Sequence, residues 1–277
     1  MGCIEKRLLN CNIHYQHWSF SAFVQEQAQM KQQEVDLYAT VPHLMIDHLR
    51  LGDISMCTEL LQQTGLHIPV FSPRAYGYSL FLDSKSDIGK ASVDYYCNCV
   101  HAAADIGAEL LCIQPANGVF FYSKDRLLEN GATALRKIAL VAADKGVRIA
   151  LGTNNPQDTP FLRTKKELDA VLDAAGCSNM GLLIDTHIIS QAEETLSMWL
   201  APSRHQVYHV RLADGRAGGY RSWGEGVYPL SRFIDALEDF DGRITLFLAG
   251  CQNTGDPAQA DRQNRELVIA AEEHNGV

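Results

Sequence analysis

The sequence predicts an α/β protein that folds as a single (β/α)8 barrel, and three observations support this fold class. Short β-rich runs alternate with amphipathic helical runs along the chain. Eight such units fit into 277 residues, which is the usual size of this barrel. The turn after the first predicted strand, Asn10–His14, contains no glycine, whereas a doubly wound open sheet usually has a glycine-rich turn there. We therefore expect one domain over residues 1–277.

The predicted strands are apolar runs of the kind that parallel sheets bury on both faces. They are Arg7–Asn12, Glu34–Tyr38, His67–Phe71, Glu109–Gln114, Val147–Gly152, Met180–Asp185, Gln206–Ala213 and Arg243–Leu248. The predicted helices between them are Ser19–Lys31, Asp47–Thr64, Ser86–Ile106, Lys124–Lys145, Thr164–Ala174, Gln191–Leu200, Pro229–Glu238 and Asp256–His274. Ser19 and Ser86 are typical N-caps, and Gly107, Gly146 and Gly176 follow predicted helix ends.

Composition excludes several classes of partner. Hydrophobic residues make up 46% of the chain, and the formal net charge is −9, from 24 basic and 33 acidic residues. A chain with this acidic balance and no basic run is not expected to bind nucleic acid or an anionic membrane. No apolar run reaches the roughly 18 residues of a membrane span, and no apolar signal core follows Met1. We expect a cytoplasmic protein.

The predicted functional face is the end of the barrel where the strands terminate, because active sites of these barrels are built there. The longest predicted loops follow the third, fourth and seventh strands and lie on this face. At the mouth we expect one residue from each of six strands: Asp36, Gln114, Gly152, Asp185, Arg211 and Phe247.

Several short motifs occur in a fixed order on successive predicted strands. They are Val35–Tyr38 with Pro42 and His43, Ser72–Pro73 with Gly77–Tyr78, Leu182–His187, Tyr208–Asp214 and Gly224–Gly226. In this order the chain resembles the xylose-isomerase-like TIM barrels of the sugar phosphate isomerase/epimerase group, and it is most similar to the fructoselysine 3-epimerases. The resemblance covers roughly Leu8 to Leu248. It implies a ketose or a ketose derivative as the small-molecule partner.

The resemblance also implies a site for one divalent metal ion, such as Mn, Co, Mg or Zn. The family holds this ion with Glu, Asp, His and Glu at the ends of the fifth to eighth strands. The corresponding positions here are Gly152, Asp185, Arg211 and Phe247, so only Asp185 matches. A shift of register does not restore the two glutamates, because residues 147–161 and 244–257 contain no Glu. We therefore expect no metal cofactor at this point.

Arg211 would place a permanent positive charge where the family places its cation. The sixth and seventh strands are neighbours in a barrel of consecutive strands, so their ends lie about 5 Å apart. A partly buried carboxylate needs a partner. We therefore predict a salt bridge between Arg211 and Asp185.

The candidate residues fall into two groups. Asp185, His187 and Glu225 are the candidate catalytic residues, whereas the candidate substrate-binding residues are His43, Tyr78, Gln114, Arg211, Arg216 and Arg221. His209 is expected to be a core histidine.

Three functions remain open for this site. The first is a barrel that binds a ketose-like molecule but is not a metal-dependent epimerase. The second is a metal-free ketose epimerase or isomerase with a rebuilt acid/base site, and the third is a non-catalytic regulatory subunit of an active paralogue. Whether the chain is an enzyme and whether it forms a homo-oligomer also stay open.

Overall fold

A closed barrel of parallel strands forms the centre of the chain, as the sequence predicts. The structure is a computed structural model that describes residues 4–50, 53–116 and 122–275. Neighbouring strands follow chain order around the barrel, and the last strand, β10, closes it against β1. The barrel strands are β1 (Leu8–Cys11), β2 (Glu34–Ala39), β3 (His67–Pro73), β4 (Leu110–Ile113), β5 (Arg148–Leu151), β6 (Met180–Asp185), β7 (Val207–Leu212) and β10 (Ile244–Leu246).

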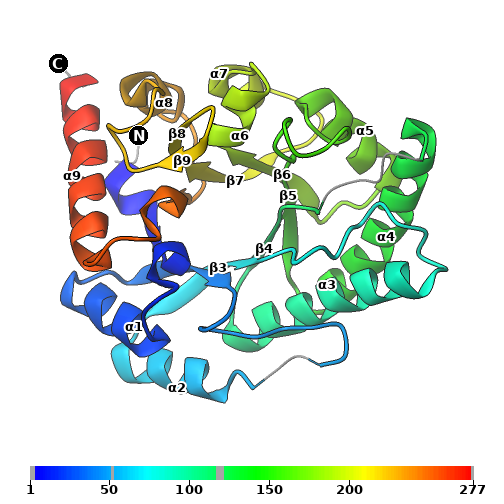
Figure 1. The fold of residues 1–277 in the computed structure, drawn as a ribbon, viewed down its shortest axis with the longest axis horizontal. Helices are drawn as coiled ribbons and strands as arrows, with labels where there is room; N and C mark the ends of the chain where they lie inside the picture. Colours follow the sequence, from blue (N-terminus) through cyan, green and yellow to red (C-terminus); the bar gives the residue numbers. More distant parts are fainter. Residues whose placement is uncertain (1–3, 51–52, 117–121, 276–277) are drawn as a thin grey trace.

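Helices surround the barrel and bury their apolar faces against it (Figure 1). They are α1 (Phe20–Gln29), α2 (Ser55–Thr64), α3 (Asp87–Ile106), α4 (Lys124–Asp144), α5 (Lys165–Ala175), α6 (Thr186–Gln191), α7 (Leu196–Leu200), α8 (Leu230–Ala236) and α9 (Pro257–Asn275). Short 3-10 helices occupy η1 (Ile4–Arg7), η2 (Asn12–Tyr15) and η3 (Ala249–Cys251). The predicted N-caps Ser19 and Ser86 are confirmed, since their hydroxyls accept hydrogen bonds from the backbone N–H groups of Ala22 and Gly89.

Two predicted helices have different bounds. The predicted helix Asp47–Thr64 begins only at Ser55, and before it the Asp47 carboxylate accepts hydrogen bonds from the N–H groups of residues 49 and 50. This local side-chain bonding competes with helix formation. The predicted helix Gln191–Leu200 is replaced by two short helices, α6 and α7, because Asp185 caps the first and Thr195 caps the second.

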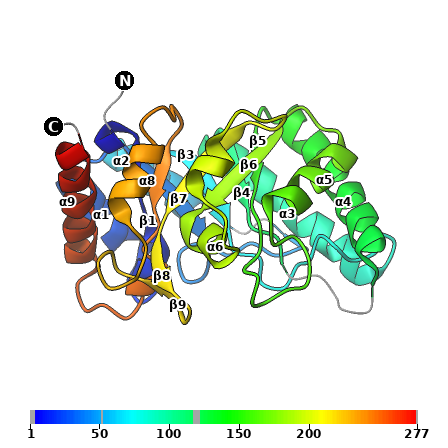
Figure 2. The ribbon, with the colours of Figure 1, turned by 90° about the horizontal axis from the view of Figure 1, so that it is seen from above.

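The predicted loop after the seventh strand contains a two-stranded antiparallel hairpin, formed by β8 (Asp214–Arg216) and β9 (Gly219–Arg221). Figure 2 shows this hairpin projecting from the barrel beside α6. The hairpin follows β7 directly, so it lies at the carboxyl end of the strands. It therefore brings side chains from outside the barrel to the predicted functional face.

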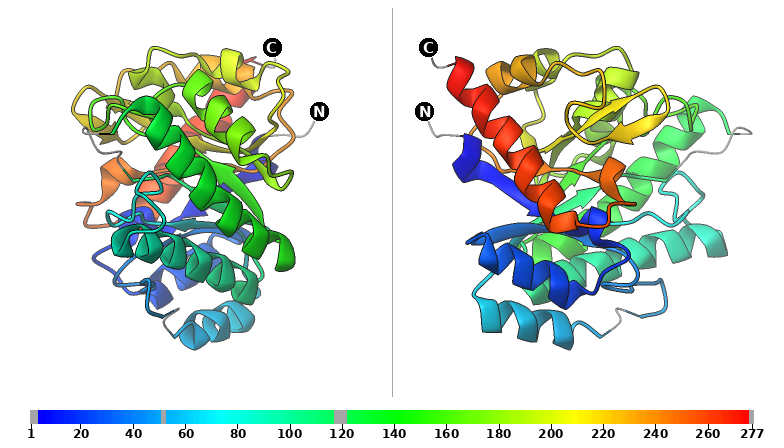
Figure 3. Two further views of the ribbon diagram at one scale, coloured as in Figure 1. Left: turned by 90° about the vertical axis from the view of Figure 1, so that its right-hand side faces the viewer. Right: turned by 60° about the vertical axis from the view of Figure 1, so that its left-hand side comes forward.

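A buried polar cluster joins the last helix to the first elements. Figure 3 shows α9, drawn in red, lying across the blue N-terminal elements. Asp261 of α9 accepts hydrogen bonds from the Tyr15 hydroxyl at 2.9 Å and the Gln27 amide at 2.8 Å, and it lies 3.3 Å from His14 Nε2. These contacts hold α9 where the barrel closes between β10 and β1. Among the described helices, none has the length and apolar character needed to cross a membrane.

Candidate functional site

A cavity of about 520 Å³ opens at the carboxyl end of the strands. Its walls come from residues that follow β3, β4 and β5, together with Tyr38 of β2, Arg211 of β7, Ile188 of α6 and Tyr220 of β9. A cavity of this size can enclose a monosaccharide. The structure thus brings two of the predicted site residues, Gln114 and Arg211, to one cavity.

The Arg211 guanidinium lies in a polar and aromatic setting within the barrel. The side chain is 1% exposed, and Nη1 donates a hydrogen bond to Gln114 Oε1 at 3.3 Å. The guanidinium carbon lies 4.7 Å from the centre of the Phe247 ring. The rings of Tyr38 and Tyr220 contact the Phe247 ring edge-on, with distances between ring centres of 6.0 and 5.7 Å. Burial opposes the charge, but the nearby Asp36 and Asp185 carboxylates help to raise the pKa of Arg211, so the guanidinium stays charged.

The predicted salt bridge between Arg211 and Asp185 is wrong. The two residues are register partners on β7 and β6, yet no described carboxylate lies within 4.0 Å of the Arg211 nitrogens. Asp185 instead caps α6, accepting hydrogen bonds from the N–H groups of His187 and Ile188 at 3.0 and 3.2 Å. Its second oxygen accepts a hydrogen bond from the Tyr220 hydroxyl at 2.9 Å. The helix that starts directly after β6 therefore supplies the partners that Arg211 was expected to provide.

Asp36 lies inside the barrel rather than at its mouth, which corrects a second prediction. It is fully buried and stands three positions before the end of β2. The Ser72 and Thr245 hydroxyls each donate a hydrogen bond to its carboxylate at 2.8 Å. Burial raises the pKa of Asp36, although the Arg211 charge and these hydroxyls oppose the rise. Asp36 therefore supports the floor of the site from below.

The four positions that the family resemblance assigns to metal ligands do not offer a donor set. Gly152 has no side chain, and Phe247 presents an aromatic ring that packs on a guanidinium. Arg211 is a permanent cation, and both Asp185 oxygens accept hydrogen bonds. Among the described residues, no group of three or more His, Cys, Asp or Glu side chains is arranged to hold a metal ion. The residues present at this point therefore do not fit a divalent cation.

None of the three candidate catalytic residues, Asp185, His187 and Glu225, lines the cavity. His187 is 1% exposed, and its Nδ1 lies 3.2 Å from the Tyr228 hydroxyl. The Tyr220 ring packs against the imidazole, with 4.3 Å between the two ring centres. Burial lowers the pKa of His187 despite the charges of Asp185 and Asp214. Glu225 is exposed in the turn that follows the hairpin.

The remaining candidate binding residues lie around the cavity without lining it. His43 is buried, and its two ring nitrogens lie within hydrogen-bond distance of Asn12 Nδ2 and the Trp18 carbonyl oxygen. Tyr78 stacks on Tyr95 at 4.2 Å, and its hydroxyl is 3.0 Å from His48 Nδ1. Both side chains hold loops in place.

Arg216 and Arg221 belong to the hairpin. Arg216 is exposed at the end of β8, while Arg221 donates a hydrogen bond to the Tyr220 carbonyl oxygen at 2.6 Å. Neither side chain lines the cavity.

Sequence reasoning missed most of the cavity lining, including Tyr38, Tyr76, Asn154 and Tyr220. Tyr38 follows Asp36 by two positions on β2 and so shares its face, which the alternation of a strand could have revealed. Tyr76 replaces the predicted Tyr78, and its hydroxyl is 2.6 Å from Thr40 Oγ1. No sequence signal places Tyr220 at the mouth, because that position depends on the hairpin.

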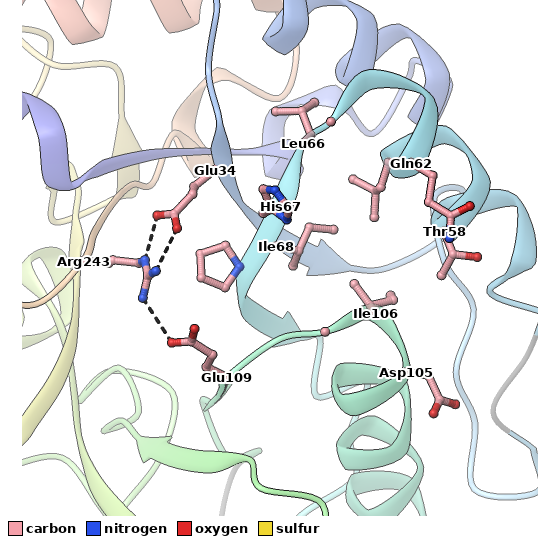
Figure 4. Close-up of a pocket in the computed structure, with 14 residues that line it drawn as sticks. Glu34, Thr58, Gln62, Leu66, His67, Ile68, Asp105, Ile106, Glu109 and Arg243 are labelled. Atoms are coloured by element: carbon pink, nitrogen blue, oxygen red, sulfur yellow. Dashed lines mark hydrogen bonds and ion pairs between the residues drawn. The ribbon is translucent and has the colours of Figure 1, made fainter.

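A second hollow lies at the opposite end of the barrel, where the strands begin (Figure 4). Arg243 donates two hydrogen bonds to the Glu34 carboxylate, both at 2.8 Å, and one to Glu109 at 3.4 Å. These partly exposed ion pairs join the starts of β2, β4 and β10. Because this end of such barrels serves stability, the candidate site is the mouth cavity.

The chain is similar in sequence to known sugar isomerases and epimerases. Residues 31–266 match the family described as xylose isomerase-like TIM barrel. An L-ribulose 3-epimerase of Methylomonas sp. (strain DH-1) is 28% identical over 119 residues, which are 42% of this chain and 41% of that protein. A ketose 3-epimerase of Arthrobacter globiformis is 22% identical over 167 residues, which are 57% of this chain and 55% of that protein. The matched segments thus span about half the length of these relatives.

The fold is also similar to solved structures. The D-allulose 3-epimerase of Methylomonas sp. superimposes with a TM-score of 0.79 at 18% sequence identity, and the match covers 96% of this chain and 97% of that one. At this identity the likeness concerns the fold alone. It agrees with the closed parallel barrel described above.

Proposed function

Because this chain belongs to the xylose isomerase-like TIM barrel family, we propose that it binds a ketose-like small molecule in its barrel mouth without a divalent metal ion. The observation that carries this proposal is the buried guanidinium of Arg211, which lies at the cavity with no described carboxylate within 4.0 Å. A fixed cation there supplies positive charge for substrate oxygens and repels a metal ion. The names of the relatives support a ketose as the ligand class.

The polar lining suits a polyhydroxylated ligand. The side-chain amides of Gln114, Asn154 and Asn155 line the cavity, and each can both donate to and accept from a hydroxyl group. Tyr38 and Tyr220 add aromatic surface beside them. A few polar groups among apolar walls are typical of small-molecule sites.

The same lining argues against ordinary epimerisation. Inverting a carbon next to a carbonyl requires acid/base groups on both faces of a planar enediolate. Among the described residues of the lining, the only carboxylate is that of Asp158, which is exposed. Binding without metal-dependent turnover is therefore the function that we propose first.

A metal-free epimerase is the second candidate, and the hydrogen bond from Tyr220 to Asp185 supports it. Burial and the Asp185 charge raise the pKa of Tyr220 well above 10, so at neutral pH its hydroxyl is protonated and can act only as an acid. A base on the opposite face would have to be Asp158.

Calorimetry and proton exchange distinguish these candidates. We expect chelator-treated protein to bind at least one member of a panel of D-fructose, D-tagatose, D-allulose and L-ribulose, with an affinity that added Mn²⁺ changes by less than about twofold. In D₂O we expect no deuterium at C3 above the buffer rate. Deuterium incorporation that Tyr220→Phe abolishes and Tyr208→Phe, at the opposite end of the barrel, retains would instead establish the metal-free epimerase. Incorporation that requires added Mn²⁺ would contradict both candidates.

A further inference from the structure

Two donor atoms of the buried guanidinium have no partner. Nη1 of Arg211 is bonded to Gln114, whereas Nε and Nη2 are buried and make no hydrogen bond within the described structure. Nε–H and one N–H of Nη2 point in the same direction along one edge of the guanidinium. That edge is the fork that binds a carboxylate through two parallel hydrogen bonds.

The acidic groups of the chain leave this fork free. The Asp36 carboxylate accepts hydrogen bonds from two hydroxyls, and the Asp185 carboxylate accepts them from two backbone N–H groups and the Tyr220 hydroxyl. No described carboxylate lies within salt-bridge distance of Arg211. Leaving charged donors buried without a partner is costly, so a ligand that satisfies them gains affinity.

From this free fork we propose that the ligand of the mouth is a sugar acid, whose carboxylate accepts two hydrogen bonds from Arg211 Nε and Nη2. This inference rests on the proposed function, and it replaces the neutral ketose with an anionic one. Asn154 supports it, because its side-chain nitrogen is also buried without a partner and lines the same cavity. An additional acceptor on the ligand, such as a hydroxyl oxygen, would satisfy it.

The charge of the cavity favours a single negative group. The other charged residues of the described lining are Arg74 and Asp158, both exposed and of opposite sign, while the Asp36 and Asp185 carboxylates near Arg211 accept hydrogen bonds from other groups. One carboxylate neutralises one guanidinium, and its planar shape matches the fork. A phosphate dianion would bring a second charge that this floor does not balance.

Nε and Nη2 of Arg211 are both shielded from solvent, so a ligand that binds them has to displace a neighbouring side chain. We take Tyr220 as this side chain, because it lines the cavity, packs on the Phe247 ring that also contacts the Arg211 guanidinium, and stands on the projecting hairpin. The Tyr220 hydroxyl donates a hydrogen bond to Asp185, and this movement would break that bond.

Calorimetric titration of the wild-type chain with a matched ligand pair tests the proposal. D-fructuronate and D-fructose differ in carrying a carboxylate or a hydroxymethyl group at C6. We expect D-fructuronate to bind at least about tenfold more tightly than D-fructose, since charge-assisted hydrogen bonds are the stronger ones. Arg211→Lys keeps the charge but removes the fork. It should lower the ratio of D-fructuronate affinity to D-fructose affinity by at least about tenfold.

The other outcomes overturn the proposal in distinguishable ways. Equal affinity for the two ligands would refute the sugar acid and leave the proposed function standing. Tighter binding of D-fructose 6-phosphate than of D-fructuronate would show that a phosphate is the preferred anion. If Arg216→Gln rather than Arg211→Lys removed the preference, the exposed hairpin arginine would hold the acid. Binding of none of these ligands and of no member of the ketose panel would refute the proposed function together with the inference.

Discussion

Lowering the pH from 7 to 3 should destabilise the folded chain by roughly 4 kcal/mol through His209 alone. His209 is fully buried in the barrel, and burial, reinforced by the charges of Arg211 and Arg243, lowers its pKa from 6.5 to about 3. The unfolded state therefore takes up a proton below pH 6.5 and the folded state does not. This contribution to the free energy of unfolding is complete above pH 6.5 and is lost as the pH falls toward 3.

Urea unfolding of the wild type and of His209→Gln at several pH values between 7 and 4 measures this effect. Glutamine retains a side-chain N–H for the Thr245 hydroxyl, which lies 2.8 Å from His209 Nε2, but it does not titrate. The wild type should lose more stability on acidification than the variant. His67→Gln, at an exposed position where β3 begins, is the control and should behave as the wild type does. An equal loss in wild type and His209→Gln would contradict the prediction.

Asp214→Ala should lower the free energy of unfolding by about 3 kcal/mol, or release the segment 214–228 from the barrel. Asp214 is buried, and its carboxylate accepts hydrogen bonds from the N–H groups of Gly215, Gly224, Gly226 and Tyr228 at 2.7 to 3.3 Å. Alanine would leave these donors without their acceptor. The turn is built for this contact: Gly224 has φ +89°, and a Cβ at Gly226 would lie 2.0 Å from Asp214 Oδ1.

Urea unfolding and limited proteolysis separate the two outcomes for Asp214→Ala. Cleavage within residues 214–228 at unchanged global stability would show local release of the segment. Asp214→Asn keeps one acceptor oxygen and should fall between the wild type and the alanine variant. Asp239→Ala, at an exposed position after α8, should leave both measurements unchanged. The prediction fails if Asp214→Ala matches this control.

The barrel could be predicted from the sequence because its signals are local. Apolar runs mark the strands, and caps such as Ser19, Ser86 and Thr164 mark where helices begin. The closed order of the strands follows from the alternation of strands and helices. The predicted start of a helix was wrong where a polar side chain bonds to the nearby backbone, as the Asp47 carboxylate does before α2.

The candidate site was predictable only in part because its contacts are not local. The alternation of β7 places Arg211 on the same face as His209, but its hydrogen-bond partner Gln114 follows β4, and the two meet only when the barrel closes. The sequence predicts Asp185 as the last residue of a strand. Its role as the N-cap of α6 could not be predicted, because it depends on the helix starting at the very next residue. Tyr220 reaches the mouth from β9, which pairs with β8 only after the barrel has placed both.

Titration of Mn²⁺ into chelator-treated protein by calorimetry tests most directly whether the Arg211 guanidinium has replaced the metal ion of the family. We expect no saturable binding at one ion per chain, because Arg211 repels a cation and the surrounding positions offer no donor set. Binding of one Mn²⁺ per chain that Asp185→Asn abolishes would contradict this replacement.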